Sequence, residues 1–379
     1  MKIAVVICEY NPLQNGHIYH LSRAKSDTGA ERVVCVMSGN FTQRGECAVS
    51  DKYTRATWAV KNGVDMVVEL PPQYVLTTAK YFALGGVKIA NLIKGDVILS
   101  FGSELGDIKA LQEIADIQED SNFKSALKTS LDLGNGYAKS YGDAIGKVSP
   151  QFADCVCSPN NILAIEYIKA LNELNSKVLP HTVKRIGGDY HDKKATELCS
   201  ASAVREACEK GKLNDVRQSV PACVYDALSR SDMQKHLDVK DRIFMLLKYC
   251  APNIDMTMIH GVKEGVENRI SSLLDECDCW QGFWSKLTTK RYTDAYLLRT
   301  LTNVLLSNEY SANDLAQENI NFVNVLAVAE RSKDLLSAFN CDVATKSGHI
   351  PNDSLIHTAD LLYSCLLGNF SNHMQIVKD

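Results

Sequence analysis

The sequence contains no long hydrophobic run, since nowhere do apolar residues approach the roughly 18 in succession that a membrane-spanning helix needs. Its first twelve residues hold one basic residue and an apolar stretch that ends at Glu9 and Asn11, without a small-residue cleavage pattern. This start predicts a buried strand and not a signal peptide. Both absences predict a cytoplasmic protein with no membrane partner.

Excess positive charge is also absent, because the net charge is −4. That balance excludes a protein that simply coats nucleic acid, so any nucleic-acid contact must be local. The 13 cysteines are an odd number in a chain without a secretory signal, which favours reduced thiols over a disulfide framework. Two C-x-C pairs, Cys155/Cys157 and Cys277/Cys279, lack the spacing and partners of a zinc site, and no metal ligands are predicted.

The chain has 379 residues, of which 45% are hydrophobic and 23% charged, as in soluble globular proteins. This length suits two domains of roughly 150–200 residues each. We predict a boundary near residue 212, with a catalytic domain at 1–212 and a helical domain at 213–379.

In the first half, short runs rich in Val and Ile alternate with helical patterns. Such runs, each bounded by Gly, Pro, Asn or Asp, predict strands at 2–8, 32–38, 65–70, 96–102 and 177–186. Helices are expected between them, one capped by Ser50 and another opened by Pro159. The alternation indicates βαβ units and an α/β, Rossmann-like parallel sheet.

From about residue 213 onward no strand is predicted. Segments 240–250, 267–276, 291–306, 324–339 and 353–367 all carry apolar residues at three- and four-residue intervals. This spacing predicts an all-helical C-terminal domain.

The stretch NPLQNGHIYH, residues 11–20, follows the first predicted strand and opens a helix. Ligands of open parallel sheets bind beyond the carboxyl ends of the strands, where the N-terminus of the next helix offers free N–H groups to an anion. Gly16 would let backbone approach a phosphate, and His17 and His20 lie one helical turn apart. An isolated G-H-x-x-H is also compatible with surface histidines.

These residues resemble the nucleotidyltransferase superfamily marked by H-x-G-H after the first strand, here written Gln14-Asn15-Gly16-His17. The second mark of that superfamily, a Ser/Thr-rich segment that opens a late helix, resembles residues 199–205, CSASAVR. The resemblance implies that Ser200, Ser202 and Arg205 hold the β- and γ-phosphates.

Eight segments between residues 9 and 301, in matching order, resemble the tRNA(Met) cytidine acetate ligase family: EYNPLQNGHIYHL, VMSGNFTQRGE, VDMVVELP, FGSELGD, SPNNILAIEYIKAL, VKRIGGDYHD, SASAVR and KRYTDAYLLRTL. The resemblance implies a Rossmann-like (HUP-type) catalytic domain and ATP-dependent acetylation of the wobble cytidine of elongator tRNA(Met). Acetate is the acyl source and acetyl-adenylate the intermediate.

The resemblance also implies an ATP site. Its residues would be Ile7, Cys8, Glu9, Tyr10, Asn11, Pro12, Leu13, Gln14, Asn15, Gly16, His17, Ile18, Tyr19, His20, Gly102, Asn160, Arg185, Ser200 and Ser202. Gln14, His17, His20 and Arg205 would act in catalysis, and His17, His20, Arg205 and Mg²⁺ would neutralise phosphate charge. Gly102 is also compatible with a tight turn, Asn160 with a helix start and Arg185 with an exposed structural charge. The loop around Arg44 is equally compatible with the site and with a plain surface loop.

Glutamine at position 14 departs from the family, which usually carries histidine there. An amide donates a hydrogen bond but never carries a full charge. Two consequences are therefore possible: slower adenylation, or loss of ATP turnover with ATP binding retained. If the missing cation limits the rate, Gln14→His should raise adenylation.

Contacts with tRNA are expected at Lys290, Arg291 and Arg299, near Tyr292 and Tyr296, and at Lys193 and Lys194 beside the phosphate site. Residues 213–379 hold 16 Lys and Arg against 21 Asp and Glu, a net charge of −5. A charged helix face with buried tyrosines therefore stays an equal alternative for the first group.

Two other functions stay open at this point. One is an adenylyltransferase that acts on a small phosphate-bearing metabolite, because both motifs serve that chemistry too. The other is a catalytically silent nucleotide- or RNA-binding relative, which Gln14 and the acidic helical part would suit.

Overall fold

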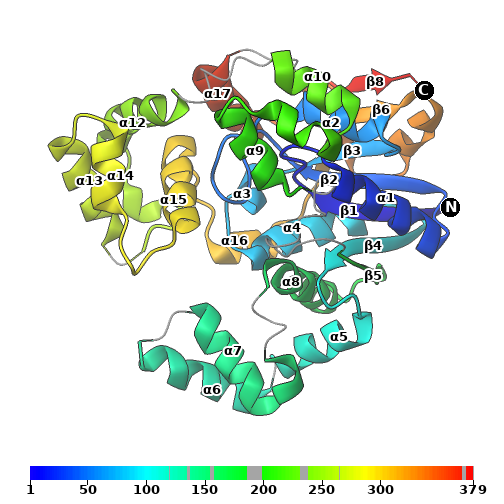
Figure 1. Ribbon diagram of the computed structural model, residues 1–379, viewed down its shortest axis with the longest axis horizontal. Coiled ribbons are helices and arrows are strands. Elements are labelled where there is room, and N and C mark those ends of the chain that lie inside the picture. The colour runs from blue at the N-terminus through cyan, green and yellow to red at the C-terminus, as the bar shows by residue number, and fades with distance from the viewer. Residues whose placement is uncertain are drawn as a thin grey trace.

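The computed structural model describes residues 1–118, 120–134, 137–153, 158–185, 199–230, 238–263, 265–368 and 373–378. Within these residues one eight-stranded sheet has the order β5-β4-β1-β2-β3-β6-β7, and β8 pairs with β6 (Figure 1). The strands are β1 (Lys2–Cys8), β2 (Arg32–Ser38), β3 (Met66–Leu70), β4 (Asp96–Ser103), β5 (Leu179–Lys184), β6 (Phe322–Ala329), β7 (Asp342–Ala344) and β8 (Gln375–Val377).

The predicted Rossmann-like sheet is confirmed, since β1 to β5 are parallel and coincide with the five predicted strands. Helices cover both faces. α1 (Asn15–Thr28) and α2 (Lys52–Lys61) lie on one face, whereas α4 (Ala79–Asn91) and α8 (Pro159–Glu173) lie on the other. Because both faces are covered, the strands need apolar residues at successive positions, as the sequence has them.

The N-terminus of α2 differs in detail from the prediction. Its cap is Asp51 and not Ser50, because the Asp51 carboxylate accepts hydrogen bonds from the N–H groups of Tyr53 and Thr54. Pro159 opens α8 as predicted, where its missing N–H has no helical partner to lose.

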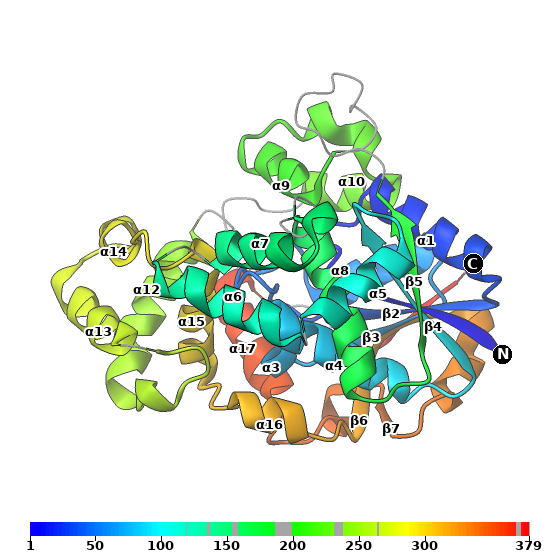
Figure 2. The ribbon, with the colours of Figure 1, turned by 90° about the horizontal axis from the view of Figure 1, so that it is seen from below.

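Further helices surround this sandwich. α5 (Ile108–Ile117), α6 (Ser121–Asp132) and α7 (Tyr137–Val148) lie together beyond α8 (Figures 1 and 2). The other helices of the described residues up to 230 are α3 (Pro72–Val75), α9 (Ala201–Glu209) and α10 (Ala222–Arg230).

The second half is mainly helical, and α12 to α15 form a group beside the sheet (Figure 1). Its helices are α12 (Val239–Cys250), α13 (Val266–Glu276), α14 (Trp280–Leu287), α15 (Asp294–Leu306), α16 (Ala312–Gln317) and α17 (Leu355–Leu367). The prediction that residues 213–379 contain no strand is wrong, because β6, β7 and β8 join the sheet and β6 runs antiparallel to β3.

β6 was missed for a physical reason. Its sequence FVNVLAVA is apolar at nearly every position and buried on both faces, so it satisfies three- and four-residue spacing without being a helix. The following residues 330–337 form a 3₁₀ segment. The division of the chain at residue 212 stays a prediction, and the sheet draws strands from both sides of it.

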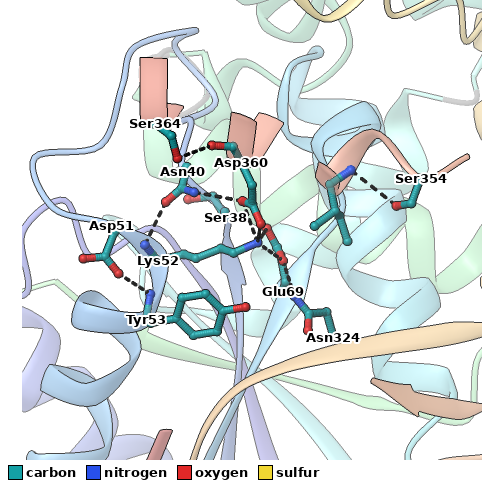
Figure 3. A network of polar contacts seen from close by, with 12 residues as sticks. Ser38, Asn40, Asp51, Lys52, Tyr53, Glu69, Asn324, Ser354, Asp360 and Ser364 are labelled. Atoms are coloured by element: carbon teal, nitrogen blue, oxygen red, sulfur yellow. Dashed lines mark hydrogen bonds and ion pairs between the residues drawn. The ribbon is translucent and has the colours of Figure 1, made fainter. Parts of the chain in front are cut away.

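A buried polar network ties α17 to the sheet (Figure 3). Nζ of Lys52 lies 2.8 Å from carboxylate oxygens of both Glu69 and Asp360. The Asn324 amide donates to Glu69 at 2.6 Å, and the Asn40 amide donates to Asp360 at 2.9 Å. The Lys52 side chain is fully buried, so the ion triad of Lys52, Glu69 and Asp360 links α2, β3 and α17, and Asn324 adds β6 to this network.

Candidate active site

The predicted phosphate-binding turn lies between β1 and α1. Gln14 is the N-cap of α1, and its side-chain oxygen accepts the N–H of Gly16. The backbone N–H of Gln14 donates to Nδ1 of His17 at 3.2 Å. Since Nδ1 accepts this bond, the neutral imidazole carries its proton on Nε2, which makes Nε2–H a donor.

His17 and His20 are neutral in this environment. Burial lowers the pKa of His17 to about 3, and the nearby charges of Arg185 and His20 add to the effect. Burial, His181 and Arg185 lower the pKa of His20 to about 4. Because desolvation disfavours the imidazolium, these environments favour neutral imidazoles, and charge neutralisation by His17 and His20 stays a prediction.

His20 is turned toward the sheet. The Ser100 hydroxyl of β4 lies 3.1 Å from Nε2 of His20 and 3.1 Å from Nδ1 of His181 of β5, and it bonds to both. This chain of three side chains holds the first turns of α1 against β4 and β5.

The second motif lies against the first. Nη1 of Arg205 in α9 donates to the backbone oxygen of Asn11 at 2.7 Å, although 194 residues separate them. Nη2 of the same guanidinium donates to the Ser202 hydroxyl at 3.4 Å, and the Ser200 hydroxyl caps α9 by accepting the N–H of Ala203. The structure thus brings Arg205 to the turn before α1, and Ser202 bonds to the same guanidinium.

A second cluster joins Gly102, Asn160 and Arg185. Nη1 of Arg185 donates to the Asn160 side chain at 3.4 Å. A Cβ on Gly102 would lie 3.4 Å from Cγ of Arg185, so glycine leaves room for this side chain across the end of β4. Arg185 also acts on the pKa values of His17 and His20, which places both clusters in one region.

Glu104 organises the second cluster and was missed as a site residue. Its carboxylate accepts hydrogen bonds from the Asn160 side chain at 2.6 Å, the Ser158 hydroxyl at 2.9 Å and the Asn161 N–H at 3.0 Å. Nε of Arg185 lies 4.0 Å from the same carboxylate. The sequence feature that could have indicated Glu104 is its position, as an acidic residue two places after Gly102.

Arg55 and Gln43 shape the segment around Glu9 and were also missed. The buried guanidinium of Arg55 donates to the backbone oxygens of Glu9, Ser38 and Gly39. The N–H of Gln43 donates to Oε1 of Glu9 at 2.7 Å. Burial raises the pKa of Glu9, against the opposing effects of the Gln43 bond and nearby arginines. No local pattern distinguishes Arg55 from a surface arginine of an amphipathic helix.

The loop that carries Arg44 is held by α15. Nη1 of Arg299 donates to the Gln43 backbone oxygen at 3.2 Å, and the Thr302 hydroxyl donates to Gly45 O at 2.8 Å. Gly45 has φ +83°, and a Cβ there would overlap the backbone of Leu298 and Arg299. One N–H group of Arg299, a predicted tRNA contact, is therefore already bonded to the Gln43 backbone.

The other residues of the predicted RNA surface lie at the start of α15. Lys290 and Arg291 are exposed, and Arg291 lies over the Tyr292 ring at 5.4 Å. Tyr292 and Tyr296 stack with ring centroids 5.2 Å apart, and the Tyr296 hydroxyl donates to Gly261 O. Lys193 and Lys194 lie outside the described residues.

Within the described ranges no group of three or more His, Cys, Asp or Glu side chains is arranged to hold a metal ion. The eleven cysteines of those ranges are free thiols. Cys277 is buried and Cys279 exposed, so that pair does not converge, while Cys155 and Cys157 lie outside the described residues. None of the helices described is long and apolar enough to cross a membrane.

Comparison with known proteins gives one consistent likeness. The family model described as HIGH Nucleotidyl Transferase matches residues 1–370. The tRNA(Met) cytidine acetate ligase of Clostridium acetobutylicum is 35% identical, over 89% of this chain and 88% of that protein. The protein of the same name from Acetivibrio thermocellus is 35% identical, over 96% of this chain and 90% of that protein.

Solved structures extend the likeness to the fold. The crystal structure of Thermotoga maritima TmcAL bound with alpha-thio ATP has a TM-score of 0.85 and 25% identity, covering 100% of both chains. The apo form of TmcAL also gives a TM-score of 0.85, at 26% identity. The sheet and the helical part are therefore both shared.

Proposed function

This chain belongs to the tRNA(Met) cytidine acetate ligase family within the HIGH nucleotidyl transferases, and we propose from this that it acetylates the wobble cytidine of elongator tRNA(Met). The reaction consumes ATP and free acetate and yields N4-acetylcytidine. One observation of the structure carries the site assignment. Arg205 of the second motif bonds to Asn11 of the first, so the phosphate-binding segments of both motifs converge.

Acetate must be activated, because an oxide or hydroxide is a poor leaving group. One acetate oxygen attacks the α-phosphorus of ATP, the bond from that phosphorus to the oxygen bridging to the β-phosphorus breaks, and pyrophosphate leaves with the electron pair. Such chemistry depends on positioning and on donors aimed at the developing charge. Nε2–H of His17 and the Arg205 guanidinium are suited to this task.

The second step transfers the acetyl group to RNA. The exocyclic N4 of cytidine attacks the acyl carbon of acetyl-adenylate, the bond from that carbon to the phosphate oxygen breaks, and AMP leaves while N4 gives up a proton. Gly102, Asn160, Arg185 and Glu104 would hold the nucleoside part of ATP, because their cluster offers amide, guanidinium and carboxylate groups beside bare backbone.

Mg²⁺ enters this proposal as part of the MgATP substrate. The described residues offer no preformed carboxylate cluster, and Mg²⁺ in such sites is commonly held through substrate phosphates and water. We assign tRNA contacts to Lys290 and Arg291 beside the stacked tyrosines, where phosphate contacts and base stacking are both available. Arg299, Lys193 and Lys194 complete the proposed set, and the location is the cytoplasm, where the substrate tRNA is found.

Mass spectrometry of tRNA after reaction tests this function. Purified protein with ATP, acetate, Mg²⁺ and methionine tRNA should yield acetylated cytidine together with AMP and pyrophosphate. Adenylated small molecules formed without any RNA would instead support a metabolite adenylyltransferase. Binding of tRNA without product would support the silent relative.

The cap role of Gln14 leads to a specific prediction. Its side-chain oxygen faces the N–H of Gly16, so Gln14→His should keep the adenylation rate within about threefold of wild type. Gln14→Ala should lower the free energy of unfolding by about 1 kcal/mol through loss of the helix cap. Pyrophosphate release and urea unfolding measure the two effects. A rise of more than about tenfold in Gln14→His would show that a missing cation limits adenylation.

A further inference from the structure

Two buried hydroxyl groups near the site have no hydrogen-bond partner. They are the Ser38 hydroxyl at the end of β2 and the Tyr167 hydroxyl in α8. The residues are 0% and 2% exposed, respectively. Buried hydroxyls are normally hydrogen-bonded, and leaving one unsatisfied costs about 1–3 kcal/mol. Two such hydroxyls therefore indicate a bound group that accepts their hydrogen bonds.

Both hydroxyls lie on the same face of the sheet. Ser38 pairs with Leu70 of β3, and Leu70 belongs to the core that α4 and α8 cover. Tyr167 belongs to that core too, and its ring packs on Phe101 of β4 at 5.5 Å. Since β1 lies between β2 and β4, the two hydroxyls flank the carboxyl end of β1.

The end of β1 is less buried than the middle of the strand. Ile7 and Glu9 are only half-buried, although β1 is a central strand with neighbours on both sides. The opposing residue of α4 is Gly86, where a Cβ would overlap the Ile7 side chain. The apolar side chains of Ile7 and Phe101 therefore lie on the same face of the sheet as the two hydroxyls, and Ile7 belongs to the segment that the proposed function gives to ATP.

We infer that Ser38 and Tyr167 bind the carboxylate of acetate, with its methyl group against Ile7 and Phe101. This inference rests on the proposed function. A carboxylate accepts hydrogen bonds only, so two unpartnered hydroxyl donors match it, and bonds to a charged acceptor are the stronger kind. The proposed function gives the turn after β1 to the phosphates of ATP. The acetate site at the end of β1 would therefore adjoin the α-phosphorus that the acetate oxygen attacks.

The charges around this subsite are compatible with an anion. Burial and the nearby Cys8 and Glu9 raise the pKa of Tyr167 well above its ordinary value, so the phenol keeps its proton and can donate. Glu9 acts on Tyr167, and the charges of Arg55, Arg205 and Arg44 act on Glu9 in the opposite direction. Three arginines thus offset the Glu9 carboxylate beside the proposed acetate.

Single removal of each hydroxyl tests the subsite in the full-length protein. Tyr167→Phe and Ser38→Ala should each raise the KM for acetate by about tenfold or more, with the KM for ATP unchanged. Neither hydroxyl has a hydrogen-bond partner within the protein, so neither variant should lose thermal stability. Acetate-dependent pyrophosphate release gives KM, and the gain in Tm from sodium acetate over sodium chloride, in the presence of ATP, gives binding without turnover.

Tyr74→Phe is the matched control. The Tyr74 hydroxyl is also buried, but it donates to Leu315 O at 3.1 Å on another part of the α4 face. This variant should lose stability and keep the KM for acetate, the reverse of Tyr167→Phe.

The outcomes separate the subsite from the function. If wild type uses acetate but both variants keep its KM, or if the KM for ATP rises equally, the subsite is overturned and the function stands. If wild type neither releases pyrophosphate with acetate nor gains Tm from it, the proposed function fails and the subsite with it.

Discussion

Lys52→Met is expected to lower the free energy of unfolding by about 3–5 kcal/mol, because it leaves two carboxylates in the interior without their counter-charge. Lys52 and Glu69 are almost completely buried and Asp360 is 21% exposed. A loss of this size is a large fraction of the stability of a typical domain. Urea unfolding followed by circular dichroism measures it.

The loss should depend on pH in a defined direction. Burial raises the pKa of Asp360 to about 6, with the Lys52 charge opposing and the Glu69 charge adding to the rise. A carboxyl group whose pKa is raised by folding contributes stability below its unfolded pKa, and this contribution is lost as pH rises through about 6. Without Lys52, protonation of Asp360 removes one buried charge, so the deficit of Lys52→Met should be smaller at pH 5 than at pH 8.

Lys61→Met is the control, since Lys61 ends the same helix and is exposed. It should change the free energy of unfolding by no more than about 0.5 kcal/mol. Equal losses in the two variants, or a pH-independent loss in Lys52→Met, would contradict a role for the buried triad.

His17→Ala is expected to lower kcat/KM for ATP by about 100-fold or more, because it removes a donor aimed at the phosphates. The imidazole is neutral and presents Nε2–H, since Nδ1 accepts the N–H of Gln14. The same change removes one bond of the helix cap, so a small drop in Tm should accompany the kinetic loss. Acetate-dependent pyrophosphate release measures the rate.

The exposed His349 serves as the comparison, because His349→Ala removes an imidazole far along the sequence from the proposed site. It should keep wild-type kinetics. If His17→Ala retained more than half of the wild-type kcat/KM, the donor role assigned to His17 would be wrong.

The sequence by itself determined the elements whose signals are local. Runs of Val and Ile bounded by turn residues predicted β1 to β5, and Gly16 with His17 after the first strand predicted the start of α1. Order and spacing of short motifs also predicted the family. These features were accessible because neighbours within one strand or one helical turn fix them, and the sequence shows those neighbours directly.

Only the tertiary structure decided the features that depend on distant partners. β6 is a strand because its continuous apolar run pairs with β3. The spacing of its apolar residues alone is compatible with a helix as well. His17 and His20 are neutral because burial and Arg185 depress their pKa values, and residue type alone cannot report burial. Ser38 and Tyr167 lie on one face beside β1 because folding brings together residues that are far apart in the chain. At such positions the chemistry of a side chain depends on its environment, which the residue type does not reveal.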